Sequence, residues 1–171
     1  MPLLDDTGFV PDPWTRLADD RPAPEGARVI VSLARLREQG PPAGAAALGV
    51  HVAPEDDPEA VAEAAARAAL ISVGFSSFAD GRGFSVARRL RAAGFAGELR
   101  AFGPLIADQF AALRACGFDA VEIPEALAAR QDEAQWLAAA RSMTLGYQRG
   151  YALPGRNILE ARRAAREEAA R

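Results

Sequence analysis

The sequence predicts an α/β protein with about five mainly parallel strands that alternate with helices. Short apolar runs rich in branched residues recur from Arg28 onward, and helical patterns with capping signals separate them. The runs are almost continuously apolar, which is typical of parallel strands in a covered sheet. An open three-layer sheet and an incomplete (β/α) barrel both fit this alternation.

Each element has its own local signal. Asp57-Pro58-Glu59 predicts a helix start, with a capping carboxylate followed by a proline and an acid in the first turn. Cys116-Gly117 predicts a helix end, since glycine favours the left-handed conformation there. Further helices are expected from about Phe84 and over 125–143. The predicted strands are 29–33, 48–52, 70–75, 99–102 and 120–123.

The domain organisation follows from turn residues and charge. Residues 1–26 are rich in turn formers and are predicted to fold onto the main body, with Asp5-Asp6-Thr7-Gly8 closing a short hairpin. Residues 27–148 are predicted to form one α/β domain. Residues 149–171 are expected to be a charged C-terminal tail with little to bury.

Composition narrows the classes of function. A net charge of −3 argues against unspecific nucleic-acid binding, which depends on neutralising many phosphates. We expect a cytoplasmic protein without membrane association, because neither a signal peptide nor a long apolar run is evident. No metal site and no cofactor is expected: there is one cysteine and one histidine, and no Gly-Lys-Ser/Thr phosphate loop is present.

The candidate binding site is the turn after the third predicted strand. Here Gly81 and Gly83 are expected to expose backbone amides to a small oxyanion while Arg82 supplies a positive charge. Parallel strands gather ligands at their carboxyl ends, so Glu122 is expected at the same edge. The full set of candidate anion-binding residues is Asp80, Gly81, Arg82, Gly83, Ser85 and Arg100.

A structural interpretation of the same turn remains open. Asp80 or Ser85 would cap a helix and Arg82 would make a surface ion pair. Cys116 is interpreted as a packing thiol and His51 as an inert strand residue. Glu98 and Arg100 lie two apart on a predicted strand, so an ion pair between them is expected. No complete catalytic constellation is evident, and catalytic residues stay unknown.

Four sequence blocks resemble the bacterial domain of unknown function 934. They occur at 78–85, 97–103, 108–109 and 116–120, and the resemblance covers roughly residues 5–148. Members of that family are typically encoded beside assimilatory sulfite reductase and are labelled probable oxidoreductases of sulfite reduction. The resemblance implies an accessory protein of sulfur assimilation that docks on sulfite reductase or its electron donor. An oxidoreductase using the Asp80, Arg82 and Ser85 edge is the alternative, and a domain that forms homo-oligomers through alanine-rich helices is a third interpretation.

Overall fold

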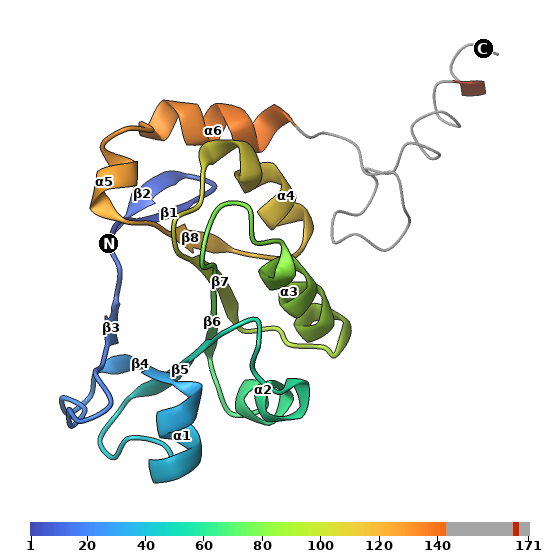
Figure 1. Cartoon of the computed structure of the whole chain (residues 1–171). Coiled ribbons are helices and arrows are strands. Elements are labelled where there is room, and N and C mark those ends of the chain that lie inside the picture. Colours follow the sequence, from blue (N-terminus) through green and yellow to red (C-terminus); the bar gives the residue numbers. More distant parts are fainter. Residues whose placement is uncertain (143–165, 168–171) are drawn as a thin grey trace.

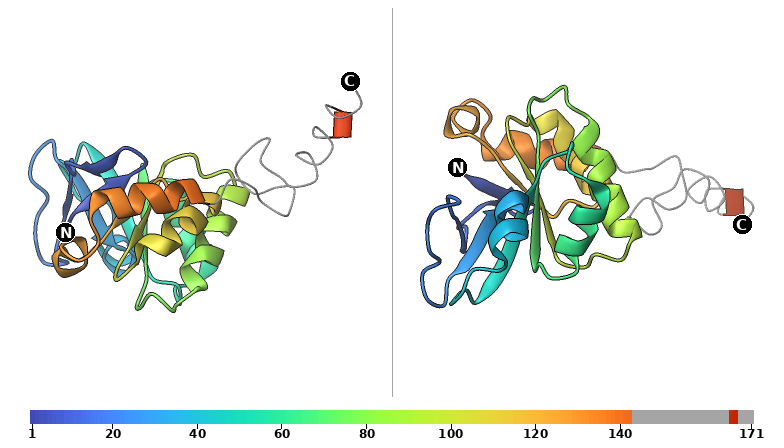
Figure 2. Two further views of the ribbon diagram at one scale, coloured as in Figure 1. Left: turned by 90° about the horizontal axis from the view of Figure 1, so that it is seen from above. Right: turned by 60° about the horizontal axis from the view of Figure 1, so that its bottom comes forward.

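A computed structural model describes residues 1–142 and 166–167 of the chain. One eight-stranded sheet, in the order β2-β1-β8-β7-β6-β5-β4-β3, curls into a half-barrel (Figure 1). Of the two architectures left open by the sequence, this is the incomplete barrel, because the helices lie on the convex side of the sheet (Figure 2). Met143, Tyr147 and the predicted tail fall outside the described residues, apart from Arg166 and Glu167, which are helical and exposed.

All five predicted parallel strands are confirmed. Each pairs in parallel with its neighbour, and the register runs through Ser32, His51, Ser72, Arg100 and Ala120. Their carboxyl ends therefore meet along one edge of the sheet, which we call the carboxyl rim. The strands are β4 (Arg28–Ser32), β5 (Ala47–Val52), β6 (Leu70–Gly74), β7 (Glu98–Phe102) and β8 (Ala120–Glu122).

The helices begin and end largely where the capping signals predicted. Asp57 accepts a hydrogen bond from the Ala60 backbone amide at 3.2 Å and so caps α2. Ser32 caps α1 in the same way through the Arg35 amide. The helices are α1 (Leu33–Gln39), α2 (Pro58–Ala65), α3 (Arg82–Ala92), the 3-10 helix η1 (Ala107–Gln109), α4 (Phe110–Ala115), α5 (Glu125–Ala128) and α6 (Glu133–Ser142).

Two predicted helix boundaries are wrong. The basic helix begins at Arg82 rather than near Phe84, because Asp80 accepts the Arg82 backbone amide and fixes the first turn earlier. The single helix predicted over 125–143 is two helices. Asp132 interrupts it by accepting the Gln135 amide at 2.9 Å, which starts a new helix N-terminus.

The N-terminal segment supplies both edges of the sheet. The predicted hairpin is present as β1 (Leu3–Asp5) and β2 (Gly8–Val10), and β1 pairs antiparallel with β8. At the opposite edge β3 (Trp14–Arg16), which was not predicted, pairs parallel with β4. Only residues 11–13 join β2 to β3, a link that spans at most about 14 Å. This short link crosses the open side of the half-barrel (Figure 1).

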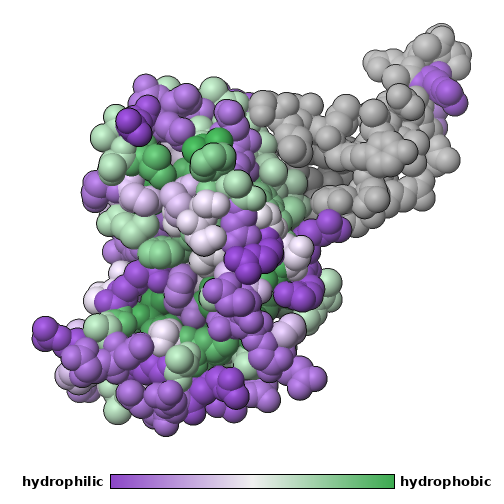
Figure 3. All heavy atoms as spheres, in the orientation of Figure 1, coloured by the Kyte–Doolittle hydropathy of each residue, from purple (hydrophilic) through white to green (hydrophobic). Residues whose placement is uncertain are grey.

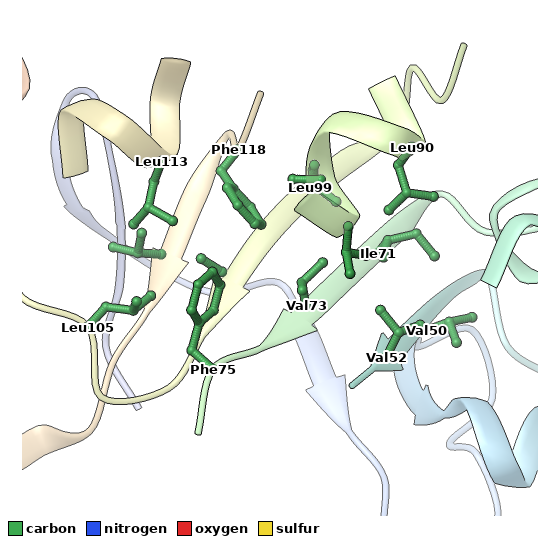
Figure 4. Close-up of a cluster of buried hydrophobic side chains, with 14 of the residues drawn as sticks. Val50, Val52, Ile71, Val73, Phe75, Leu90, Leu99, Leu105, Leu113 and Phe118 are labelled. Atoms are coloured by element: carbon green, nitrogen blue, oxygen red, sulfur yellow. The ribbon is translucent and has the colours of Figure 1, made fainter. Parts of the chain in front are cut away.

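The two faces of the sheet differ in chemistry. The outer face packs its apolar side chains against the helices. Figure 4 shows Leu90 of α3 beside Ile71 of β6, and Phe75 beside Phe118. The inner face carries the buried polar side chains Ser72, Arg100 and Glu122, beside a small apolar cluster of Trp14, Ile30 and Leu70. On the molecular face seen in Figure 3, hydrophilic and hydrophobic residues are interspersed. Within residues 1–142 and 166–167, no helix combines the length and the apolar character needed to cross a membrane.

Candidate functional site

A cluster of polar side chains occupies the inner face of the half-barrel, and we call it the inner cluster. Alternate residues of a strand face opposite sides of the sheet, so the polar residues set at every second position of β5 to β8 share this face. The inner cluster comprises Asp12, Arg16, His51, Ser72, Glu98, Arg100, Phe102 and Glu122.

Arg16 is the centre of the cluster toward the carboxyl rim. Its Nε and Nη2 donate to the two carboxylate oxygens of Glu122 at 2.8 and 2.6 Å, and Nη2 also donates to Ser72 Oγ at 2.7 Å. The guanidinium carbon lies 4.0 Å from the centre of the Phe102 ring. The Glu122 side chain is 5% exposed and that of Arg16 28%, so the ion pair is largely shielded while the arginine keeps contact with solvent.

His51 lies beside this ion pair. Its Nδ1 is 3.2 Å from Ser72 Oγ, and its ring meets Phe102 edge-on with 5.1 Å between the ring centres. Burial, and then the positive charge of Arg16, lower the pKa of His51 below its usual value. His51 is therefore neutral at pH 7, and both it and Arg16 share the Ser72 hydroxyl.

Arg100 forms the deeper half of the inner cluster. Its side chain is 1% exposed and donates to Glu98 at 2.6 Å and to Asp12 at 2.7 Å, with Glu122 3.8 Å away. Burial acts to lower the pKa of Arg100, but the hydrogen bonds to Asp12 and Glu98 outweigh it and raise the pKa. The predicted pair of Glu98 and Arg100 is thus present, in the middle of the sheet and joined by a third residue from the N-terminal link.

The turn predicted from the sequence lies at the carboxyl rim, directly after β6. Asp80 accepts three hydrogen bonds from Arg82, from the backbone amide, Nε and Nη2, and a fourth from Ser76 Oγ. These bonds, those from Arg82 first, hold the pKa of Asp80 far below its usual value. Glu55 lies 3.7 Å from Arg82 Nη1. The guanidinium is therefore paired mainly with its own neighbour in the sequence.

The two glycines of this turn differ in their surroundings. A Cβ on Gly83 would stand 2.5 Å from the Phe75 ring, so glycine is required for α3 to pack closely on β6. Gly81 has nothing within 4 Å of such an atom and a negative φ of −83°. Ser85 is exposed on α3. The first five candidate residues therefore stay together at the rim, whereas Arg100 bonds to Asp12 and Glu98 on the inner face.

Four polar residues of the inner cluster were missed from the sequence, and one of them is Asp12, in the link before β3. Arg16 lies on the unpredicted strand β3, Ser72 was counted as part of an apolar run, and His51 was interpreted as inert. Glu122 was expected at the carboxyl edge and is found there. The sequence did contain a signal for three of these positions. His51, Ser72 and Glu122 are polar residues between apolar neighbours, and alternate residues of a strand face opposite sides of the sheet.

The structure also describes the surroundings of Cys116. Cys116 ends α4 and is half-buried, and burial raises the pKa of its thiol, which keeps it protonated at neutral pH. Among the described residues, no group of three or more His, Cys, Asp or Glu side chains has the arrangement of a metal site.

Comparison with known proteins identifies a family. The family model described as "Bacterial protein of unknown function (DUF934)" matches residues 49–154, which is more than half of the chain. The match covers β5 to β8 and so includes most of the inner cluster and the whole rim turn. No curated protein matches the chain. The chain therefore belongs to the DUF934 family of bacterial proteins.

Proposed function

We propose that the protein is an accessory protein of assimilatory sulfite reduction, one that binds a small oxyanion and docks on sulfite reductase or its electron donor. The pathway rests on the resemblance of its four sequence blocks to proteins encoded beside sulfite reductase. The observation that carries the oxyanion half is the position of Arg16 at the carboxyl rim, where its guanidinium keeps contact with solvent. Ligands of parallel β/α folds gather at this edge of the sheet.

Docking is supported by an exposed aromatic residue in the rim turn. Phe78 is 60% exposed, and its backbone carbonyl accepts a hydrogen bond from Gln109 at 2.8 Å, which anchors the loop to η1. An anchored, exposed aromatic side chain is typical of the residues that dominate protein–protein interfaces. Phe78 lies within the first of the four sequence blocks, so the proposed contact belongs to the segment that carries the resemblance.

Co-purification tests the docking. The tagged full-length chain is expected to retain sulfite reductase or its electron donor from the native host. Phe78→Ser is expected to lose most of that partner, whereas Glu59→Ser, on an exposed position of α2, should retain it. A strain lacking the gene is expected to grow poorly with sulfate as the sole sulfur source. Normal growth of that strain would refute the pathway.

An oxidoreductase-type enzyme of sulfite reduction is the second candidate. It is favoured by the neighbourhood of His51, Ser72 and Arg16, because an imidazole with a lowered pKa beside a cation is a common arrangement for proton transfer. In this case the protein would take electrons from a separate carrier. The assay is sulfite-dependent oxidation of a reduced donor by the purified chain, compared with Arg82→Ala and His51→Gln. If the purified chain oxidises none of the reduced donors tested, the enzyme candidate is rejected and the accessory function is retained.

A further inference from the structure

Arg16 has donor groups that the protein does not use. Its hydrogen bonds to Glu122 and Ser72 employ Nε and Nη2. Nη1 makes no hydrogen bond within residues 1–142, yet it is not among the buried atoms that lack a partner, so it reaches solvent. The Phe102 ring, 4.0 Å from the guanidinium carbon, removes water from one face of the group. A ligand would therefore meet two free N–H donors on a cation that is already fixed in place.

His51 offers a third donor close by. Ser72 Oγ accepts from Arg16, which can only donate, and lies 3.2 Å from Nδ1 of His51. When the serine donates to Nδ1, the imidazole proton is on Nε2, which is the tautomer that an anion at Nε2 selects. This edge of the ring faces Gly74, where even a methyl group would stand 3.4 Å from Nε2. Nε2, like Nη1 of Arg16, is not a buried unpaired atom.

We propose that Arg16 Nη1 and His51 Nε2 together form a binding site for a small inorganic oxyanion at the carboxyl end of the half-barrel. The two groups lie on either side of one serine hydroxyl and against one aromatic ring. Both groups act as donors in this tautomer, which suits a ligand with several acceptor oxygens and no protons to give. This inference deepens the proposed function, and it rests on that function for the choice of sulfite as a ligand.

The charges of the inner cluster allow an anion here. Glu122 lies between Arg16 and Arg100, and its Oε2 is 2.6 Å from Arg16 Nη2 and 3.8 Å from Arg100 Nη1. Asp12 and Glu98 are bound to Arg100, deeper on the inner face. These three carboxylates are thus engaged with guanidinium groups. Asp56, whose charge also acts on His51, accepts the Ala53 backbone amide at 2.7 Å. The anion adds negative charge next to His51. Uptake of a proton by His51 would balance that charge, so the bound anion raises its pKa.

The only histidine of the chain provides a direct readout. We would follow the imidazole resonances of the full-length native protein by NMR over a pH range, in chloride and then with sodium sulfate or sodium sulfite added. Sulfate keeps one charge state over this range, so its effect on the resonances is not confounded by its own titration. The expected result is a saturable shift and a raised pKa of His51 with either salt. Resonances that follow the chloride control would overturn the site.

Substitutions place the anion on particular residues. By calorimetry, Arg16→Lys and His51→Gln are expected to weaken sulfite or sulfate binding by at least about tenfold, since lysine lacks the guanidinium fork and the glutamine cannot take up a proton. Arg82→Lys is the matched control at the exposed rim arginine, and it should bind within about twofold of the native protein. Loss of binding in Arg82→Lys with retention in Arg16→Lys would move the anion to the rim turn and refute the inference. The NMR measurement on the native chain decides the matter if the variants are unfolded.

Failure of this site and failure of the pathway are separable. Binding in the purified protein, together with normal growth of the deletion strain on sulfate, would retain the anion site and reject the pathway. Poor growth of the deletion strain on sulfate, without any effect of anions on the His51 resonances, would retain the pathway and reject the anion site.

Discussion

Arg100→Met tests directly whether the buried ion pairs of the inner face stabilise the fold. Methionine approximates the length of the arginine side chain, so the packing volume is largely kept while the charge is removed. The native guanidinium is 1% exposed and lies within 4 Å of carboxylate oxygens on Asp12, Glu98 and Glu122. Glu122 would keep Arg16, but the other two carboxylates would lose their cation.

The expected loss follows from the burial of the arginine. Removing one partner of a buried ion pair typically costs about 3–5 kcal/mol, because the remaining charge is left uncompensated. That is a large part of the roughly 5–15 kcal/mol by which a folded domain is stable. For a chain of this length it corresponds to a fall in Tm of about 6–20 °C.

Urea denaturation of the full-length chain at neutral and acid pH is the assay. The hydrogen bond from Arg100 holds the pKa of Asp12 below its usual value of 3.8, although burial acts in the opposite direction. The native protein therefore gains stability from Asp12 above pH 3.8 and loses it as the pH falls through the lowered pKa. The variant lacks the part of this contribution that comes from Arg100 and keeps the part from the Trp14 amide. The difference between native and variant should shrink at acid pH. Equal midpoints for Arg100→Met and for Arg82→Met, on the exposed rim, would refute the reasoning.

Three further measurements test other parts of the structure. Gly83→Ala should cost about 1–3 kcal/mol because the new methyl group meets the Phe75 ring, whereas Gly81→Ala, with open space around it, should leave Tm almost unchanged. The lowered pKa of His51 stabilises the fold fully above its unfolded value of 6.5 and progressively less below it, so His51→Gln should flatten the dependence of Tm on pH in that window. Cys116 should react with iodoacetamide at pH 7 more slowly than free glutathione, since burial raises the pKa of its thiol, and equal rates would contradict this.

The strands were predictable because each is a short apolar run with one strong local pattern. Leu70 to Gly74, for example, has residues of exposure below 2% at four successive positions, as expected for a central strand. The curl of the sheet was not predictable from these runs. The edge strand β3 was not predictable either. It is only three residues long and is held by pairing to β4, and no local pattern in Trp14-Thr15-Arg16 indicates that contact.

Of the candidate site, the rim turn was predictable from the sequence and the inner cluster was not. The Asp-Gly-Arg-Gly turn is a local motif, and its position after β6 follows from chain order alone. The inner cluster is assembled across the sheet: Arg16 and Glu122 are 106 residues apart in the sequence. Such a contact becomes visible only when the strand order and the register are known.

The buried guanidinium of Arg100 needs more hydrogen-bond acceptors than the parallel strands place against it. Glu98 of β7 accepts a hydrogen bond from Arg100, whereas Glu122 of β8 lies 3.8 Å away. The N-terminal segment adds Asp12 to Arg100 and Arg16 to Glu122, both across the open side of the half-barrel. These ion pairs hold residues 11–13 in place and keep Arg16 at the carboxyl rim. There Nε and Nη2 of Arg16 are bound to Glu122 and Ser72, and Nη1 is left for a ligand. The segment therefore completes the inner face structurally and brings the cation on which the proposed oxyanion site depends.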